Sequence, residues 1–444
     1  MEPSSYQIHS STLSFLSHGE SAERWAGIVA HYQTIFKAEP AEKWLLYESD
    51  SFVFSALFYA LLASGKSIVL PHNGQPEHIK YVKKSVDASV GETSVEPSVL
   101  ADLTTDSSTS ISLSIPAEAE VCFYTSGSTG TPKIIKKQFK SLQCEVDALE
   151  DKFSDLVRDT LFLSTVPHQH IYGLLYKILW PISKGHAFVC QAFEYPEQMA
   201  NRMLLDDHSA VSIITSPAQL HRLVLDNPLI PVLDKVKNVF SSGGPLDAEK
   251  NLVLQRELQC DILEVFGSTE TGGIGWRNRQ SITGEDWLTF KGIKLSYQPN
   301  SDLLAISSPY INQDLYYADD RAEILADDRF RVLGRADSVV KIEEKRVSLD
   351  EVQNRLKQHQ YIDDAFVVVV GTNRRKLAAL IVLNDEGLQV SQERKKIELD
   401  RMFKGFLSNW YEAILLPKKY RYPTELPYNA RGKLSRREAE SYFE

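Results

Sequence analysis

The sequence has few cysteines, no long apolar run and no excess of positive charge, and each shortage excludes a class of protein. Its four cysteines are widely spaced along 444 residues, so we expect buried free thiols, neither a disulfide framework nor a cysteine metal site. The run nearest to membrane-spanning length, Phe52–Ser64, is too short for a bilayer. The N-terminus lacks the basic and apolar pattern of a secretory signal. These features predict a cytoplasmic protein without a membrane span.

The charge balance and the overall composition narrow the class further. The net charge of −10 argues against nucleic acid as a partner. Hydrophobic residues make up 43% and charged residues 24%, which is typical of a globular protein with a large core. The length suggests two or three domains.

Alternating helix-like and strand-like segments predict an α/β fold. Ser51–Ser64 has the pattern of an apolar helix that Gly65 ends, and Lys66–Leu70 has that of a buried strand. Strand, helix and strand at this spacing favour a parallel sheet. Thr104–Ser114 is rich in Ser and Thr, and we expect a surface loop there.

The pattern changes in the last third of the chain. Residues 287–335 hold short alternating runs that predict a β-rich subdomain. Beyond Ser338 a helix (349–358), two strands (365–370 and 377–382) and a charged amphipathic helix (392–415) predict a small α+β unit. We place the boundary at Asp337, giving a large N-terminal domain of sandwiched α/β sheets (1–336) and a small C-terminal domain (337–444).

The stretch Tyr124–Lys133, with the sequence YTSGSTGTPK, is the strongest functional signal. It follows an apolar strand-like run, Glu120–Tyr124, and precedes a second one, Lys133–Lys137. Glycines, hydroxyls and backbone N–H groups in such a loop form a concave array of donors that suits phosphate oxygens. It is not a Walker A loop, because Lys133 follows Pro132 and precedes Ile134. The alternative is a plain Ser/Thr/Gly linker, which would not need flanking strands and a lysine.

Three further strands lead into polar or glycine-rich turns. They are residues 210–215, 237–241 and 260–266, followed respectively by Pro217, by the turn Ser242–Pro245 and by Gly267–Gly273. Ligands of open α/β sheets bind at the carboxyl ends of the strands. The sequence therefore predicts one composite site.

A strand at 160–165 delivers two histidines, His168 and His170. Being two residues apart, they would share one face of an extended segment. A zinc pair is one interpretation, but no third ligand is evident nearby. A structural role and a position in a pocket wall are the other two.

Several motifs along the chain resemble those of the adenylate-forming superfamily. This superfamily includes acyl-CoA synthetases, peptide-synthetase adenylation domains and luciferases. Five motifs between residues 124 and 433 carry this resemblance in the family's order. They are Tyr124–Lys133 (phosphate loop), Phe266–Glu270 (second signature), Tyr317–Asp320 (ribose), Gly334–Asp337 (hinge) and Leu426–Lys433 (C-terminal lysine).

The resemblance implies ATP and Mg²⁺ as cofactors and a role for each matching residue. The phosphates would be held by Thr125, Ser126, Gly127, Ser128, Thr129, Gly130 and Lys133. The nucleotide would further contact Gly243, Gly244, Pro245, Glu264, Val265, Phe266, Gly267, Asp320 and Arg335. The catalytic set would be Lys433, His170, Thr269 and Glu270, and Mg²⁺ would be bound by Thr125 and Glu270.

The implied reaction has two steps that require the small domain to move about a hinge at Asp337. A carboxylate attacks ATP to give an acyl-adenylate, and a thiol then displaces AMP. The substrate pocket would be lined by His170, Tyr172, Ser241, Ser242, Gly272, Gly273 and Gly275. We expect an aromatic acid resembling hydroxybenzoate, with a medium-chain fatty acid as the alternative.

The thiol would come from CoA or from an acyl carrier protein, and the sequence is compatible with both.

The sequence departs from the family's pattern at three points. These are the short N-terminal region, Phe266 in place of tyrosine and Glu344 in place of glycine. Two other classes compete: a non-catalytic nucleotide-binding scaffold, and an enzyme that transfers AMP. Taken singly, Glu270 is also compatible with a helix start, Asp320 and Arg335 with a surface ion pair, and Lys433 with a solvated tail.

Overall fold

The computed structural model describes most of the chain and divides it into two compact units. The described residues are 4–15, 21–71, 73–92, 110–125, 133–205, 210–225, 227–280, 286–336, 339–342, 345–371, 375–411, 413–428 and 434–444. One unit comprises Met1–Lys294 and Ile306–Tyr316, and the other Leu295–Ala305 and Tyr317–Glu444. Among the helices of the described residues, none is long and apolar enough to cross a bilayer.

The first unit contains a five-stranded sheet in the order β5-β3-β4-β7-β8. All neighbours are parallel except β7 and β8, which form an antiparallel pair. The strands are β3 (Lys43–Tyr47), β4 (Ser67–Leu70), β5 (Ala88–Gly91), β7 (Glu120–Thr125) and β8 (Lys133–Gln138). A separate antiparallel pair joins β1 (Ser5–His9) to β6 (Ser112–Pro116).

A second sheet of this unit runs in the order β15-β14-β13-β12-β11-β9-β10-β2. From β2 to β13 the neighbours are parallel, and β14 and β15 follow antiparallel. The strands are β2 (Ser14–Phe15), β9 (Leu161–Ser164), β10 (Ala187–Ala192), β11 (Val211–Thr215), β12 (Val236–Ser241), β13 (Asp261–Ser268), β14 (Gly272–Asn278) and β15 (Trp287–Thr289).

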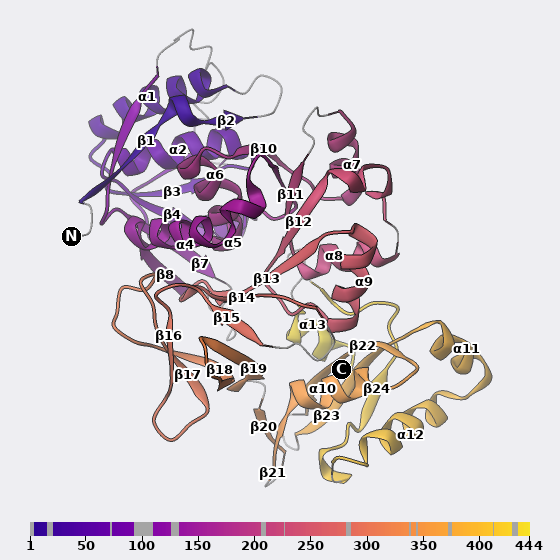
Figure 1. Cartoon of the computed structure of the whole chain (residues 1–444). Coiled ribbons are helices and arrows are strands. Elements are labelled where there is room, and N and C mark those ends of the chain that lie inside the picture. The colour runs from indigo at the N-terminus through magenta and orange to yellow at the C-terminus, as the bar shows by residue number, and fades with distance from the viewer. Residues whose placement is uncertain are drawn as a thin grey trace. The chain divides into compact units, whose positions relative to one another are not determined.

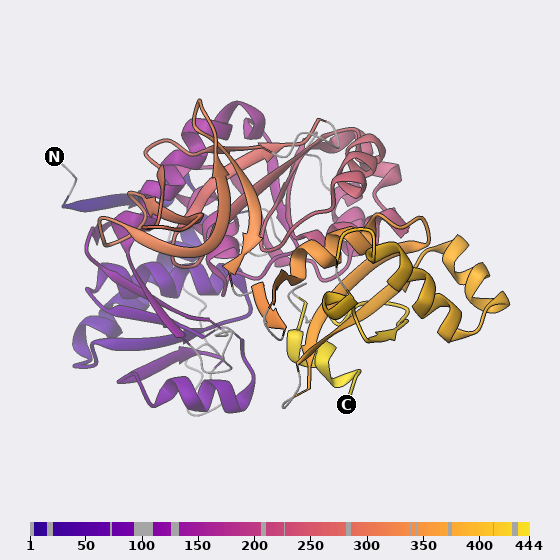
Figure 2. The same ribbon diagram turned by 90° about the horizontal axis from the view of Figure 1, so that it is seen from below.

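Helices α2 (Ser51–Ala63) and α4 (Phe139–Val157) lie between these two sheets (Figures 1 and 2). Helix α2 contacts β3 and β4 of one sheet and β10 of the other, and α4 contacts β8 and β12. Because α2 is covered on all sides, nearly all of its side chains are apolar and buried. Asp50 caps its start by accepting from Val53 N, and Gly65, at φ +74°, allows the turn after it.

Other helices cover the outer faces of the sheets. Helix α3 (Pro76–Lys83) packs on the five-stranded sheet, and α1 (Ala22–Ala38) packs on α2. Helices α7 (Pro196–Leu205), α8 (Pro217–Leu225) and α9 (Ala248–Leu258) bury the outer face of β9, β11, β12 and β13. The short helices α5 (Ile171–Gly173) and α6 (Trp180–Lys184) follow β9, with a π-helical turn (Leu174–Leu179) between them.

The second unit contains a four-stranded arrangement and a small α+β body. The first has the order β16-β17-β18-β19, with β16 (Lys294–Tyr297), β17 (Leu303–Ser307), β18 (Tyr316–Ile324) and β19 (Arg329–Arg335). A hairpin of β20 (Val339–Ile342) and β21 (Lys345–Ser348) follows. The small sheet joins β22 (Ile362–Val370), β23 (Lys376–Leu383) and β24 (Lys419–Arg421).

Helices cover both faces of that small sheet. One face is covered by α10 (Leu349–Lys357) and α12 (Lys396–Leu407), the other by α13 (Arg436–Ser441). Helix α11 (Asp385–Glu393) follows β23. The predicted α/β class with a small α+β part is confirmed, whereas the division at Asp337 and its hinge stay predictions.

Two local predictions were wrong. The single helix expected at 392–415 is α11, α12 and a 3-10 turn (Ala413–Leu415), because Lys395 begins a new helix with Glu398 bonded back to its N–H. The loop expected at Thr104–Ser114 ends early, since residues 112–114 are already part of β6. Pairing with β1 supplies the hydrogen bonds that the local composition did not reveal.

Candidate active site

The carboxyl ends of four parallel strands meet at one edge of the larger sheet. The pairing is Ser164 with Ile214, Thr215 with Ser241, and Ser241 with Glu264. Side chains tie these ends together: Thr165 Oγ1 donates to Thr215 Oγ1 at 2.8 Å, and Ser242 Oγ donates to Val265 O at 2.8 Å. The predicted convergence of strand ends is therefore present.

The predicted phosphate loop connects β7 to β8 as the loop of a hairpin. Thr125 and Lys133 pair at its base, where Thr125 Oγ1 donates to Lys133 O at 3.3 Å. Residues 126–132, which include the predicted Ser126, Gly127, Ser128, Thr129 and Gly130, lie outside the described residues. The base fixes where the loop leaves the sheet.

The second signature forms the tip of the β13–β14 hairpin. Ser268 pairs with Gly272, and Ser268 N donates to Thr271 Oγ1 at 3.1 Å while Thr271 N donates to Ser268 Oγ at 3.2 Å. Thr269 and Glu270 stand half-buried at the tip. The helix start considered for Glu270 is wrong, because the segment turns directly from one strand into the next.

An ion pair joins the two signatures. Lys133 Nζ lies 3.3 Å from Glu270 Oε1, although 137 residues separate them in the sequence. Lys133 is largely exposed and Glu270 about a quarter exposed, so both remain accessible to a ligand. The structure thus brings together the predicted phosphate-binding cation and the predicted metal ligand.

Two buried charged residues that the sequence did not single out contact the same hairpin. Lys137 Nζ donates to Glu270 O at 2.8 Å and to Tyr310 O at 2.7 Å, and burial lowers its pKa to about 8. Glu145, on α4, accepts from Gly273 N at 2.6 Å, and burial raises its pKa to about 7. The only available signal was Lys137 on the inward face of β8, two residues after the apolar Ile135.

Glu145 also accounts for one glycine of the predicted pocket. Gly272 has φ +71°, and a Cβ atom there would lie 2.4 Å from Glu145 Oε2. Gly273 and Gly275 follow on β14, where Gly275 pairs with Phe266. Any side chain at position 272 would therefore collide with the buried carboxylate of Glu145.

The two histidines have different environments. His168 is buried, with Nδ1 2.7 Å from Ser51 Oγ and Nε2 2.8 Å from Glu48 O, and burial lowers its pKa to about 3. His170 is half-buried at the start of α5. The shared extended face was a wrong expectation, because the chain turns at 168–169. His168 has the structural role, and no cluster of three metal-binding side chains occurs within the described parts of the chain.

Of two residues predicted to line the pocket, Ser241 ends β12 and Tyr172 contacts that strand. Tyr172 OH donates to Phe240 O at 2.9 Å, and its ring packs against Tyr176 with centroids 4.7 Å apart. Ser241 is buried, while Ser242, Gly243 and Gly244 are more open. An aromatic wall thus adjoins the Ser-Gly-Gly turn.

Phe266, the predicted adenine-stacking residue, packs against Trp287 with ring centroids 5.4 Å apart. The Arg277 guanidinium lies 4.0 Å from the centre of that Trp287 ring. Arg277 in turn donates to both oxygens of Glu264, at 3.0 and 2.8 Å. A continuous stack therefore supports Phe266 from the sheet interior.

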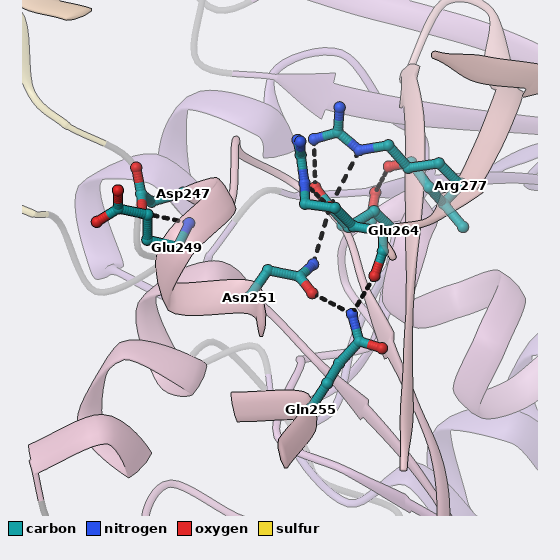
Figure 3. A network of polar contacts seen from close by, with 9 residues as sticks. Asp247, Glu249, Asn251, Gln255, Glu264 and Arg277 are labelled. Carbon is teal, nitrogen blue, oxygen red and sulfur yellow. Dashed lines mark hydrogen bonds and ion pairs between the residues drawn. The ribbon is translucent and has the colours of Figure 1, made fainter. Parts of the chain in front are cut away.

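Glu264 lies at the centre of a buried polar network (Figure 3). Asn251 Nδ2 donates to Glu264 Oε1 at 2.9 Å, and Gln255 Nε2 donates to Asn251 Oδ1. Arg279 Nε lies 3.6 Å from the same oxygen. The carboxylate is thus occupied within the protein, and the nucleotide contact of Glu264 stays a prediction.

The predicted ribose residues belong to the second unit and lie side by side there. Asp320 and Arg335 are register partners of β18 and β19, and Arg335 Nη1 lies 3.7 Å from Asp320 Oδ1. Arg335 Nη2 also lies 3.5 Å from Asp319 Oδ2. Two acidic groups therefore orient one guanidinium.

Lys433, Asp337 and Glu344 lie outside the described residues, but both neighbours of the lysine segment are placed. Tyr428 and Leu434 form an antiparallel bridge, and Ser435 N donates to Pro427 O at 3.1 Å. Tyr428 OH donates to Asp364 Oδ2 at 2.9 Å, which ties this base to β22. Lys357, 2.5 Å from Asp364, helps to hold the pKa of that carboxyl below its usual range.

Comparison with known proteins agrees with this geometry. The family model described as "AMP-binding enzyme" matches residues 88–293. The match covers a little under half of the chain, and the chain is similar to the AMP-forming acid–thiol ligases, the class of the CoA ligases.

Individual relatives are distant. The 4-coumarate–CoA ligase of Halorhodospira halophila is 29% identical, over 70% of this chain and 74% of its own. A benzoate CoA ligase from Burkholderia xenovorans has a similar fold, with a TM-score of 0.74 at 17% identity over 96% of each chain. ATP-bound MatB from Rhodopseudomonas palustris has a TM-score of 0.76 at 15% identity, over 95% of this chain and 92% of its own.

Proposed function

We propose that the protein uses MgATP to convert a carboxylic acid into an acyl-adenylate and then transfers the acyl group to a thiol. The observation that carries the proposal is the 3.3 Å pair of Lys133 and Glu270. A cation for phosphate and a carboxylate for a metal stand together at the mouth of a hydroxyl-rich loop. MatB, which shares the fold, has been crystallised with ATP.

In the first step a carboxylate oxygen attacks the α-phosphorus of ATP and the bond to pyrophosphate breaks. Lys133 and the loop hydroxyls would hold the β- and γ-phosphates, and Thr269 would donate to the α-phosphate. Lys433 would place an ammonium between the acid and the α-phosphate, where negative charge develops. In the second step a thiolate attacks the acyl carbon and AMP leaves.

Glu270 fits the magnesium ion that such a reaction needs. Mg²⁺ in nucleotide sites is bound by one or two carboxylates together with substrate phosphates and water. Glu270 supplies one accessible carboxylate, and the hydroxyl of Thr125 stands at the base of the adjoining loop. The ion would neutralise phosphate charge, and the Lys133–Glu270 pair would exchange its mutual contact for contacts with the phosphates and the ion.

The family motifs also suggest which residues would hold the nucleoside. Phe266 and the turn Gly243–Pro245 would enclose the adenine, and Phe266 can stack although it lacks a tyrosine hydroxyl. Asp320 would accept hydrogen bonds from the ribose hydroxyls, with Arg335 donating nearby. These assignments rest on the family motifs and on the placement of each residue at a strand end or strand pair.

We propose an aromatic acid as the substrate. The ring of Tyr172 packs on Tyr176, and its hydroxyl donates to Phe240 O, so an aromatic surface lies at the carboxyl end of β12. The relatives named 4-coumarate–CoA ligase and benzoate CoA ligase point to the same substrate class. A medium-chain fatty acid is the competing substrate, because small residues at 272, 273 and 275 would also leave room for an alkyl chain.

The acceptor is CoA or the phosphopantetheine thiol of a carrier protein. The segment from Lys418 to Arg437 has seven basic residues and one acid, Glu425. Such a segment attracts the phosphates of CoA and the acidic surface of a carrier protein alike.

The test is ATP turnover with a panel of acids, in which hydroxylamine traps the acyl-adenylate as a hydroxamate. We expect hydroxamate from aryl acids, and thioester when CoA or a holo-carrier protein replaces hydroxylamine. Preference for C6–C12 acids would favour the fatty-acid alternative. No hydroxamate with any acid would favour a nucleotide-binding scaffold, and AMP bound covalently to another protein would favour an AMP transferase.

A further inference from the structure

Lys137 is buried in the first unit, yet its ammonium is aimed at the catalytic hairpin. It lies on β8 on the same face as Lys133, four residues earlier, and its side chain is among the largest that are fully buried. Lys133 reaches the side chain of Glu270, whereas Lys137 reaches the backbone carbonyl of the same residue at 2.8 Å. Two lysines of one strand thus contact two different groups of Glu270.

Glu145 holds the opposite side of the hairpin turn. Its Oε1 accepts from Gly273 N at 2.6 Å, and its other oxygen occupies the space that the missing side chain of Gly272 leaves. Lys137 therefore holds the carbonyl of Glu270 at the tip of the hairpin, and Glu145 holds the N–H of Gly273. Each charge is also close enough to the other to act on its pKa.

We infer that Lys137 and Glu145 are positioning residues that hold the Glu270 turn in place for magnesium nucleotide. The inference rests on the proposed function of Glu270. The turn is a short hairpin tip whose own side-chain hydrogen bonds join Ser268, Thr271 and Gly272 and do not involve Glu270. The ammonium of Lys137 also donates to the carbonyl oxygen of Tyr310, which anchors the turn to a separate segment of the unit.

A role limited to filling the core would not require charged residues here. Burying an ammonium and a carboxylate carries a large desolvation penalty, and well-packed apolar residues often replace such groups without loss of stability. The preceding residue of β8, Lys136, shows the ordinary arrangement, since its side chain is 60% exposed and pairs with Glu120. Lys136 is therefore the matched control for Lys137.

The experiment measures ATP affinity of the full chain by calorimetry, with Mg²⁺ and with EDTA, for Lys137→Met, Lys136→Met and the double variant Lys137→Met/Glu145→Met. We expect Lys137→Met to bind MgATP about tenfold more weakly, equivalent to one displaced ionic contact, with little change in EDTA. Lys136→Met should match the wild type in both conditions.

The double variant separates positioning from stability. It removes both buried charges, so it should fold even where a single substitution leaves an orphan ion. If the role is positioning, the double variant folds and still binds MgATP about tenfold more weakly. The inference is overturned if the folded double variant binds MgATP as the wild type does, or loses affinity equally in EDTA. Wild-type protein that binds no MgATP at all would instead overturn the proposed function.

Discussion

At the scale of single residues, Lys433 has the largest predicted effect on the chemistry. We expect Lys433→Ala to slow adenylation by about 10²–10³-fold, by analogy with the loss of one donor that stabilises transition-state charge. The measurement is acid-dependent exchange of pyrophosphate into ATP. Arg437→Ala is the control, because Arg437 is an exposed cation of the same basic segment. Equal rates in both variants would reduce Lys433 to a solvated lysine.

His168 gives a prediction for acid stability. Its folded pKa of about 3 lies below the unfolded value near 6.5, so the unfolded chain binds more protons between these values. Stability should therefore fall as the pH drops from 7 toward 3. At pH 5 the contribution of His168 should have fallen by about 2 kcal/mol.

The matching measurement is urea unfolding of the wild type and His168→Gln at pH 8 and pH 5. The difference in free energy of unfolding between the wild type and the variant should be smaller at pH 5 than at pH 8, because the variant has no imidazole to protonate. The comparison cancels the effect of Glu48, whose pKa is raised to about 7 by burial and has the opposite sign. An unchanged difference between the two proteins would contradict the assignment.

Sequence motifs found Lys133, Glu270 and Phe266, but residues that act through buried contacts were missed. The sequence around Lys137 indicates only a charged strand, and the sequence around Glu145 indicates only an amphipathic helix. Their importance comes from packing against β13 and β14, more than 120 residues away in sequence. Single-sequence patterns report local periodicity and therefore do not reveal such contacts.

At the scale of elements, the Glu264 network fastens β13 to α9 and β14. Replacing Glu264 by Met leaves the guanidiniums of Arg277 and Arg279 buried without their carboxylate. We expect the free energy of unfolding to fall by about 3–5 kcal/mol, as when one partner of a buried pair is removed. Glu257→Met, at an exposed position of the same α9, should change it by less than about 0.5 kcal/mol in urea unfolding. A small effect at Glu264 would show that the network is replaceable.

Most helices and strands of the site followed from the sequence. The strands before the phosphate loop and before the second signature are where the apolar patterns placed them. The expected helix at 392–415 was wrong because the break at Arg394–Lys395 depends on one capping contact. Charge-rich sequences show the amphipathic period of two consecutive helices without marking the turn between them.

At the scale of the whole molecule, the predicted hinge at Asp337 separates the two half-reactions. Proline removes the N–H and restricts φ, so Asp337→Pro should oppose any rotation at that residue. We expect thioester formation to slow more than pyrophosphate exchange. Rapid-quench assays of both steps measure this, with Asp328→Asn, an exposed loop residue, as the control. Equal slowing of both steps would contradict a hinge at Asp337.

The order of five motifs predicted the family, and the family model agrees with that prediction over residues 88–293. Their order along the chain did not predict how the chain divides into compact units: residues 295–305 and 317–335 belong with the C-terminal part. That division depends on contacts between residues far apart in the sequence, and the order of motifs does not report such contacts. The proposed preference for an aromatic acid likewise depends on side-chain packing around Tyr172 and Ser241, which motif order does not report.

The most direct test of the account is exchange of labelled pyrophosphate into ATP by the purified chain, with and without an aryl carboxylic acid. If the protein forms an acyl-adenylate, the exchange requires both the acid and Mg²⁺. The rate of exchange is then lower in Lys433→Ala than in the wild type. Exchange that is absent with every acid, or that proceeds equally without acid, would contradict it.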